Sequence, residues 1–134
     1  MLADAPITAF VATARPADAR AFYADVLGLR LLHDDQFALE FVGGGTSLRV
    51  AKVEQLQPAG YTVLGWTVPD IQAAVTDLAA RGVQFERFPA FMQQDAQGVW
   101  TTPAGDRIAW LIAPLSELTM EGGVPCGTNT PFHS

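Results

Sequence analysis

The side chains that most often carry out covalent catalysis are scarce in this chain of 134 residues. It holds two histidines, His33 and His133, and one cysteine, Cys126. A Ser-His-Asp or Cys-His arrangement needs a histidine beside the nucleophile, and only His33 falls in the part of the chain that we expect to be compact. One cysteine also excludes an internal disulfide and a cysteine-rich zinc site. The sequence therefore predicts no nucleophilic active site.

Two acidic positions could take part in other chemistry. His33 precedes Asp34 and Asp35, but adjacent strand residues point to opposite faces, so we interpret this triplet as a solvated turn and not as a metal site. Glu40 is a candidate general base, and the alternative is an acidic residue on an exposed face. The GGG run at 43–45 lacks a following helix and a Lys-Ser/Thr pair, so it is no phosphate-binding loop.

Composition limits the partners of the chain. Fourteen acidic and eight basic residues give a net charge of −6, and no basic cluster is present. Nucleic acid is therefore not expected as a partner, because phosphate binding needs positive charge. No apolar run reaches the roughly 20 residues that span a bilayer, and the N-terminus lacks the basic and apolar regions of a secretory signal. We expect a cytoplasmic protein without a membrane partner.

The elements that would position these residues occur in two similar sets. In the first half, strand patterns at 7–13, 29–35, 37–41 and 46–53 surround a helix that begins at Pro16 and ends at Gly28. After a polar linker at 54–60, strands at 61–68, 83–88, 98–102 and 107–112 surround a helix from the cap Asp70 to Gly82. The separation near 55 residues indicates a duplicated unit.

The remaining residues, 114–134, lie outside this repeat. We expect Glu117 to Met120 to add one edge strand, and the turn-rich tail from 121 to be irregular. The predicted fold class is α+β, built from two tandem βαβββ modules.

The segments AFYADVLGLRL and DIQAAVTDLAARGVQF resemble the vicinal oxygen chelate superfamily, which includes glyoxalase I, bleomycin resistance proteins and extradiol dioxygenases. The resemblance covers about residues 6–113. It implies a single domain over 1–134, with module 1 at about 6–53 and module 2 at about 61–113. The curved sheets of the two modules would enclose a cleft. Members of this fold often dimerise, so a homodimer is implied.

The enzymes of that superfamily hold a divalent metal in the cleft. By position, their ligands would fall at Thr8, at Leu48 or Arg49, at Val63 and at Ala109. None of these residues is a good donor, whereas a catalytic metal usually needs three protein ligands. Glu117 lies past the matched region and is only a weak candidate. We therefore expect no metal and no other cofactor.

Strand alternation predicts which side chains line the cleft. We expect a small-molecule site that is apolar and aromatic, with a few hydroxyls and arginines. Trp66 and Trp110 are expected behind the sheet. Alternatively, Arg49 is a solubilising charge on an edge strand, and Trp100 covers one end of the sheet. The predicted lining residues are Thr8, Phe10, Arg49, Val63, Thr67, Trp100, Arg107 and Leu111.

Three functions stay open at this point. The leading hypothesis is a metal-independent protein that binds a small apolar or aromatic ligand, similar to the bleomycin resistance proteins. The second is a metal-dependent lyase or dioxygenase that uses Glu117 or Glu40 with non-standard partners. The third is a structural or dimerisation module without a ligand. No catalytic residue is assigned.

Overall fold

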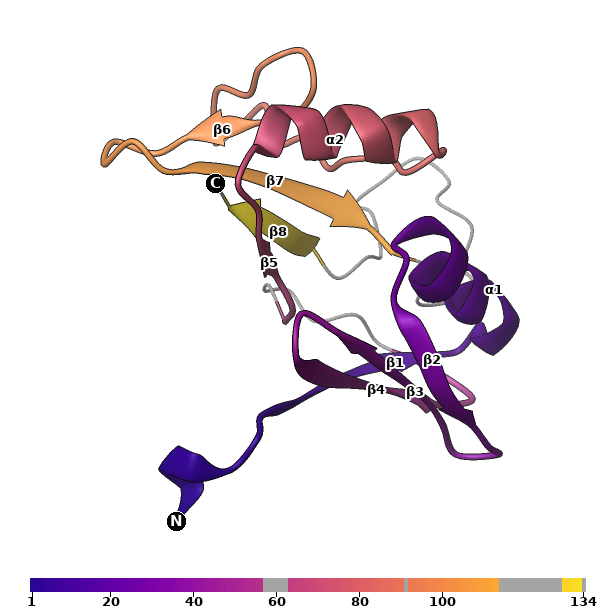
Figure 1. The fold of residues 1–134 in the computed structure, drawn as a ribbon. Helices are drawn as coiled ribbons and strands as arrows, with labels where there is room; N and C mark the ends of the chain where they lie inside the picture. The colour runs from indigo at the N-terminus through magenta and orange to yellow at the C-terminus, as the bar shows by residue number, and fades with distance from the viewer. Residues whose placement is uncertain (57–62, 91, 114–128, 134) are drawn as a thin grey trace. The chain divides into compact units, whose positions relative to one another are not determined.

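The computed structural model describes residues 1–56, 63–90, 92–113 and 129–133 (Figure 1). The chain divides into two compact units, with the described residues up to 56 in the first and those from 63 onward in the second. Each unit contains a four-stranded sheet and one principal helix. The predicted α+β class is confirmed at this level.

The first unit is a complete βαβββ module. Its sheet has the order β1-β4-β3-β2, in which β1 runs parallel to β4 and the other pairs are antiparallel. A short 3-10 helix at Leu2–Asp4 precedes it. The elements are β1 (Thr8–Thr13), α1 (Pro16–Ala21), a π-helical turn (Phe22–Val26), β2 (Arg30–Asp34), β3 (Ala38–Gly43) and β4 (Thr46–Lys52).

The helical segment of the first unit begins at Pro16 and ends before Gly28 as its sequence predicts, but only its first part, α1, is α-helical. Pro16 occupies the first turn, where its missing N–H has no helical partner to lose. The helix closes through the π turn, and Gly28 then takes a φ of 78°, which a glycine adopts without steric cost. The N–H of Leu29 donates to the carbonyl of Tyr23 at 2.9 Å and directs the chain into β2.

One face of the first sheet packs against α1 and its π turn. Tyr23 lies with its ring 5.6 Å from that of Phe41, and both side chains are buried. Alternate residues of the strands complete this core, because successive strand side chains point to opposite faces. Its other buried members are Val11, Thr13, Ala19, Phe22, Leu39, Leu48 and Val50.

The second unit has a sheet of order β5-β8-β7-β6 (Figure 1). Helix α2 begins at the predicted cap, because the Asp70 carboxylate accepts from the N–H of Ala73 at 3.1 Å. It ends at Ala80, and Gly82, with a φ of 90°, follows the cap residue Arg81. The elements are β5 (Trp66–Thr67), α2 (Ile71–Ala80), β6 (Trp100–Thr101), β7 (Arg107–Ile112) and β8 (Asn129–His133).

Three expectations for the second unit need correction. The segment 83–88 is not a strand, since it meets β7 through one isolated bridge between Phe85 and Leu111. The strand expected at 61–68 is described only as β5, at 66–67. The tail is not irregular throughout, because β8, which includes His133, lies between β5 and β7. The strand expected at Glu117 to Met120 lies outside the described residues.

The hairpin predicted around residues 102–106 is confirmed. Trp100 of β6 pairs with Ile108 of β7 in antiparallel register. The N–H of Thr102 donates to the carbonyl of Asp106 at 2.7 Å and closes the turn. None of the helices in the described ranges is long and apolar enough to cross a membrane.

Candidate ligand-binding surface

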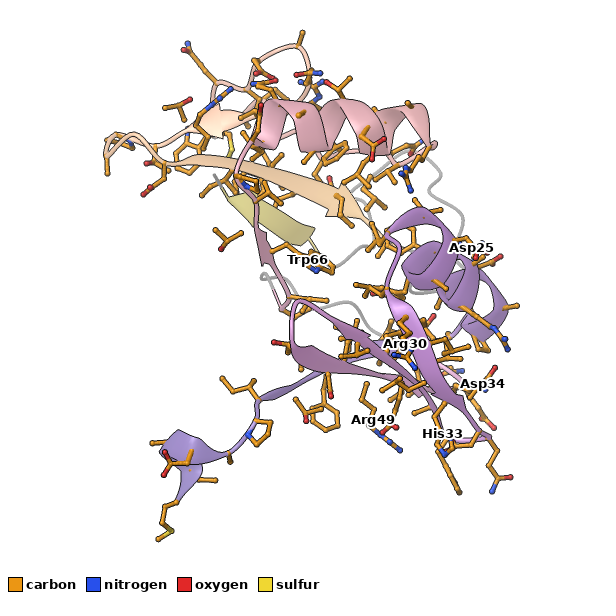
Figure 2. The ribbon with its side chains drawn as sticks, in the orientation of Figure 1. Asp25, Arg30, His33, Asp34, Arg49 and Trp66 are labelled. Atoms are coloured by element: carbon orange, nitrogen blue, oxygen red, sulfur yellow. The ribbon has the colours of Figure 1, made fainter. Side chains whose placement is uncertain are left out.

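Four side chains form a row across the face of the first sheet that α1 does not cover. The register pairs Phe10 with Arg49, Arg49 with Glu40, and Glu40 with His33. Paired residues on neighbouring strands share a face, so one residue from each of the four strands contributes to this cross-strand row. Figure 2 shows Arg49 and His33 projecting from the sheet on the side away from α1.

An ion pair occupies the middle of the cross-strand row. Nη1 of Arg49 donates to Oε1 of Glu40 at 2.7 Å, and the two side chains keep 34% and 40% of their surface exposed. Beside Arg49, Phe10 is 64% exposed. Arg49 lies on β4, an inner strand between β1 and β3, so the alternative of an edge-strand charge is wrong.

The sequence placed the fourth-strand family position at either Leu48 or Arg49. The sheet register shows that these two residues lie on opposite faces. Leu48 pairs with Phe41 and is buried on the helix side. Arg49 shares the open face with Phe10. Thr8 lies exposed at the start of β1, on the same face as Phe10. The first unit thus brings three predicted lining residues onto one face.

The three residues of the His33-Asp34-Asp35 triplet lie in different places. His33 lies on the open face, Asp34 on the face of α1, and Asp35 in the turn that follows β2. Asp34 accepts from Nη1 of Arg20 at 2.7 Å and from Nζ of Lys52 at 2.6 Å. These two cations lower the pKa of Asp34, with the hydrogen bond from Lys52 as the largest cause. Asp34 therefore ties β2 to α1 and β4, and it is not a free metal ligand.

Asp35 is used in the turn between β2 and β3. Its Oδ1 accepts from the N–H groups of Phe37 at 2.7 Å and Ala38 at 3.0 Å. These backbone donors hold the pKa of the Asp35 carboxyl below its usual range, and the charges of Arg49 and His33 act in the same direction. The carboxylate is committed to local structure.

The predicted lining residues of the second unit do not share one face. Trp100 pairs with Ile108 and so lies on the face of Trp110, and the two indole rings are 6.2 Å apart and stacked. Arg107 and Leu111 alternate with these residues and lie on the opposite face. Ala109 and Leu111 are fully buried. Val63 and Thr67 are exposed, and Trp66 is half-buried.

The second unit contains a hollow of about 660 Å³. Asp95 is the one charged residue among the described residues that line it, and its carboxylate accepts from the N–H groups of Gln97 and Val99 and from Nε2 of Gln72. The carboxylate therefore holds the 94–99 loop and α2 together. The hollow is lined by Pro89, Ala90, Met92, Gln93, Asp95, Val99, Trp100 and Thr101.

The structure adds a residue that the sequence analysis missed. Glu86 is 3% exposed, and its buried Oε1 has no hydrogen-bond partner within the described part of the chain. Burial raises its pKa to about 7, because a charged carboxylate loses its hydration there. The sequence contains only a weak sign that Glu86 is buried. It lies in VQFERF, where half of the residues are apolar.

The positions expected to hold a metal do not fit one. Leu48 and Ala109 are buried apolar residues, Val63 has no donor atom, Arg49 is a cation, and Thr8 offers a single hydroxyl. Within the described ranges, no three His, Cys, Asp or Glu side chains are grouped so that they could hold a metal ion. Glu117 and Cys126 lie outside those ranges.

The comparisons with known proteins agree with the βαβββ module of the first unit. The sequence profile of the Glyoxalase/Bleomycin resistance protein/Dioxygenase superfamily matches residues 6–109. The chain belongs to this superfamily. A search of the curated proteins finds no match to it.

Several solved structures share its fold. A member from Sphaerobacter thermophilus is 20% identical with a TM-score of 0.68, and the match covers 99% of this chain and 98% of that one. TnmS3, an antibiotic binding protein from a Streptomyces species, is 20% identical with a TM-score of 0.62, over 98% and 96%. Lactoylglutathione lyase from Agrobacterium tumefaciens is 15% identical with a TM-score of 0.68, over 97% and 92%.

Proposed function

We propose that this superfamily member is a metal-independent protein that binds a small apolar or aromatic molecule. The observation that carries the proposal is the cross-strand row, in which an exposed Phe10 lies beside a guanidinium on the open face of the first sheet. An aromatic ring with a few placed polar groups is typical of small-molecule sites. The fold shared with the antibiotic binding protein TnmS3 supports this choice of function.

The ligand surface in this proposal includes the three predicted residues of the first unit, Thr8, Phe10 and Arg49.

Binding of the fluorescent probe anilinonaphthalene sulfonate tests this proposal on the full chain. The probe carries two aromatic groups and one anionic group, which match Phe10 and Arg49. We expect saturable binding to the wild type and binding about tenfold weaker in Phe10→Ala, the equivalent of ~1.4 kcal/mol, because the ring contact is lost.

Phe37 provides the matched control. It is 66% exposed and lies between β2 and β3, outside the cross-strand row. Phe37→Ala should bind the probe as the wild type does. Equal loss in both variants, or no loss in Phe10→Ala, would show that the open face is not the binding surface.

Metal independence needs a separate measurement. After incubation of the full chain with Mn²⁺, Fe²⁺, Ni²⁺ or Zn²⁺ and removal of free metal, we expect no stoichiometric cation, because none of the four family positions holds a good donor. One bound cation per chain would overturn this part of the proposal and favour a metal-dependent lyase or dioxygenase.

A further inference from the structure

The cross-strand row presents its chemical groups in a fixed order over about 14 Å, since it crosses three gaps of about 4.8 Å between neighbouring strands. Along the row come an aromatic ring, a guanidinium, a carboxylate and an imidazole, supplied by Phe10, Arg49, Glu40 and His33. The strand ladder fixes this order, because each residue is held by backbone pairing to its neighbour.

Both members of the central ion pair keep capacity for a ligand. The guanidinium has five N–H donors, and the described structure uses Nη1 for Glu40. Glu40 accepts through Oε1, and a carboxylate has a second oxygen to offer. Because about a third or more of each side chain is exposed, a ligand can reach both groups.

The opposite charges of the pair restrict what can bind. A purely anionic ligand at Arg49 meets Glu40 next to it, and a purely cationic ligand at Glu40 meets Arg49. A molecule that carries both charges satisfies each group, because complementary charges fix register and penalise single-charge competitors. The exposed ring of Phe10, on the other side of Arg49, adds an aromatic contact next to the anion position.

We propose that the open face of the first sheet selects an aromatic zwitterion, with its carboxylate on Arg49, its ammonium group on Glu40 and its ring on Phe10. This inference rests on the proposed function, since it names the ligand class of the same surface. An amino acid with an aromatic side chain is the smallest compound with the required groups.

Three matched compounds test the charge requirement on the full chain by calorimetry or NMR titration. L-phenylalanine carries both charges, 3-phenylpropanoate lacks the ammonium group, and 2-phenylethylamine lacks the carboxylate. We expect L-phenylalanine to bind at least about tenfold more tightly than either other compound, because each lost contact is a hydrogen bond between charged groups.

Two substitutions assign the charges to their residues. Arg49→Gln should remove the advantage of L-phenylalanine over 2-phenylethylamine, and Glu40→Gln should remove its advantage over 3-phenylpropanoate. Asp77→Asn is the control, because Asp77 forms an exposed ion pair with Arg81 on α2 and should leave all three affinities unchanged.

The outcomes separate this inference from the proposed function. Equal binding of the three compounds to the wild type would overturn the proposal that the open face selects an aromatic zwitterion. This comparison uses only the wild type, so it holds even if both variants fail to fold. If Phe10-dependent binding of anilinonaphthalene sulfonate persisted in that case, the proposed function would stand. If a second copy of the chain covered Phe10, no compound would bind, Phe10→Asp would yield monomers, and the inference would be wrong.

Discussion

At the scale of single residues, Glu86 is the least expected feature of the second unit. Its N–H donates to the carbonyl of Trp110 at 2.7 Å, which fixes the backbone beside β7, and its side chain is buried. Its buried Oε1 has no partner among the described residues. A buried charge without a partner is unfavourable, so the neutral carboxylic acid is favoured in the folded state.

Glu86 therefore makes folding stability fall as the pH rises. The pKa is about 7 in the folded chain against an ordinary value of 4.5, so the folded state binds more protons between these values. We expect the Glu86 contribution to be most favourable below pH about 4.5 and to be lost on passing pH 7. The free energy of unfolding should change by on the order of 3 kcal/mol, since each unit of pKa difference is worth ~1.4 kcal/mol.

Denaturant unfolding of Glu86→Gln at several pH values measures this effect. The variant should be more stable than the wild type at pH 8 and should lose the wild-type decrease between pH 5 and 8. Glu54→Gln, at an exposed position, is the control and should follow the wild type. An unchanged pH profile in Glu86→Gln would contradict the assignment.

At the scale of elements, the β-bulge in β2 decides the composition of the cross-strand row. The register shifts between Leu31 and His33, so that Leu31 pairs with Phe41 and His33 with Glu40. Regular alternation would place residues 31 and 33 on the same face. The extra residue, Leu32, instead directs His33 to the open face and Asp34 to the side of Arg20 and Lys52.

Helix α2 depends on its N-terminal cap. The carboxylate of Asp70 satisfies the N–H of Ala73, one of the helix donors that has no backbone partner. Replacing Asp70 by Ala should lower the free energy of unfolding by ~1 kcal/mol. Chemical denaturation of Asp70→Ala measures this loss.

Asp77→Ala is the comparison on the same helix. The exposed ion pair of Asp77 with Arg81 contributes little, because such pairs are worth about 0–1 kcal/mol. Its free energy of unfolding should therefore stay near that of the wild type. If the two variants were equally destabilised, general helix weakening would explain the result and the cap would not.

At the scale of the whole molecule, we expect two copies of the chain to associate. The expectation rests on the dimers that the resemblance to the superfamily implies and on the edges of the first sheet as the described residues form it. In the first unit β1 and β2 form the two edges of the sheet, and edge strands present unpaired backbone groups to another chain. Light scattering should give twice the chain mass of 14.3 kDa, and a monomer at high concentration would contradict this prediction.

Much of the fold follows from short stretches of the sequence. Pro16, Gly28, Asp70 and Gly82 mark the helix boundaries because each solves a local backbone problem at a helix end. The alternating strands of the first unit are found for a similar reason. The segment 83–88 was predicted wrongly, because its alternation satisfies the strand pattern while only Phe85 forms a bridge with β7.

The sequence was enough to predict which types of residue form the candidate site. It predicted only part of their arrangement. Alternation already separated Arg49 from Leu48 and placed Phe10 with Thr8. The sequence by itself thus determined the helices, the βαβββ order of the first unit, the superfamily and the lack of good donors at the family's metal positions, because these depend on local patterns. Only the tertiary structure decided that residues 10, 49, 40 and 33 form one row, that Trp100 lies on the face of Trp110, and that Glu86 is buried. Strand register, the bulge and burial arise from contacts between residues distant in the chain, and no local pattern specifies them.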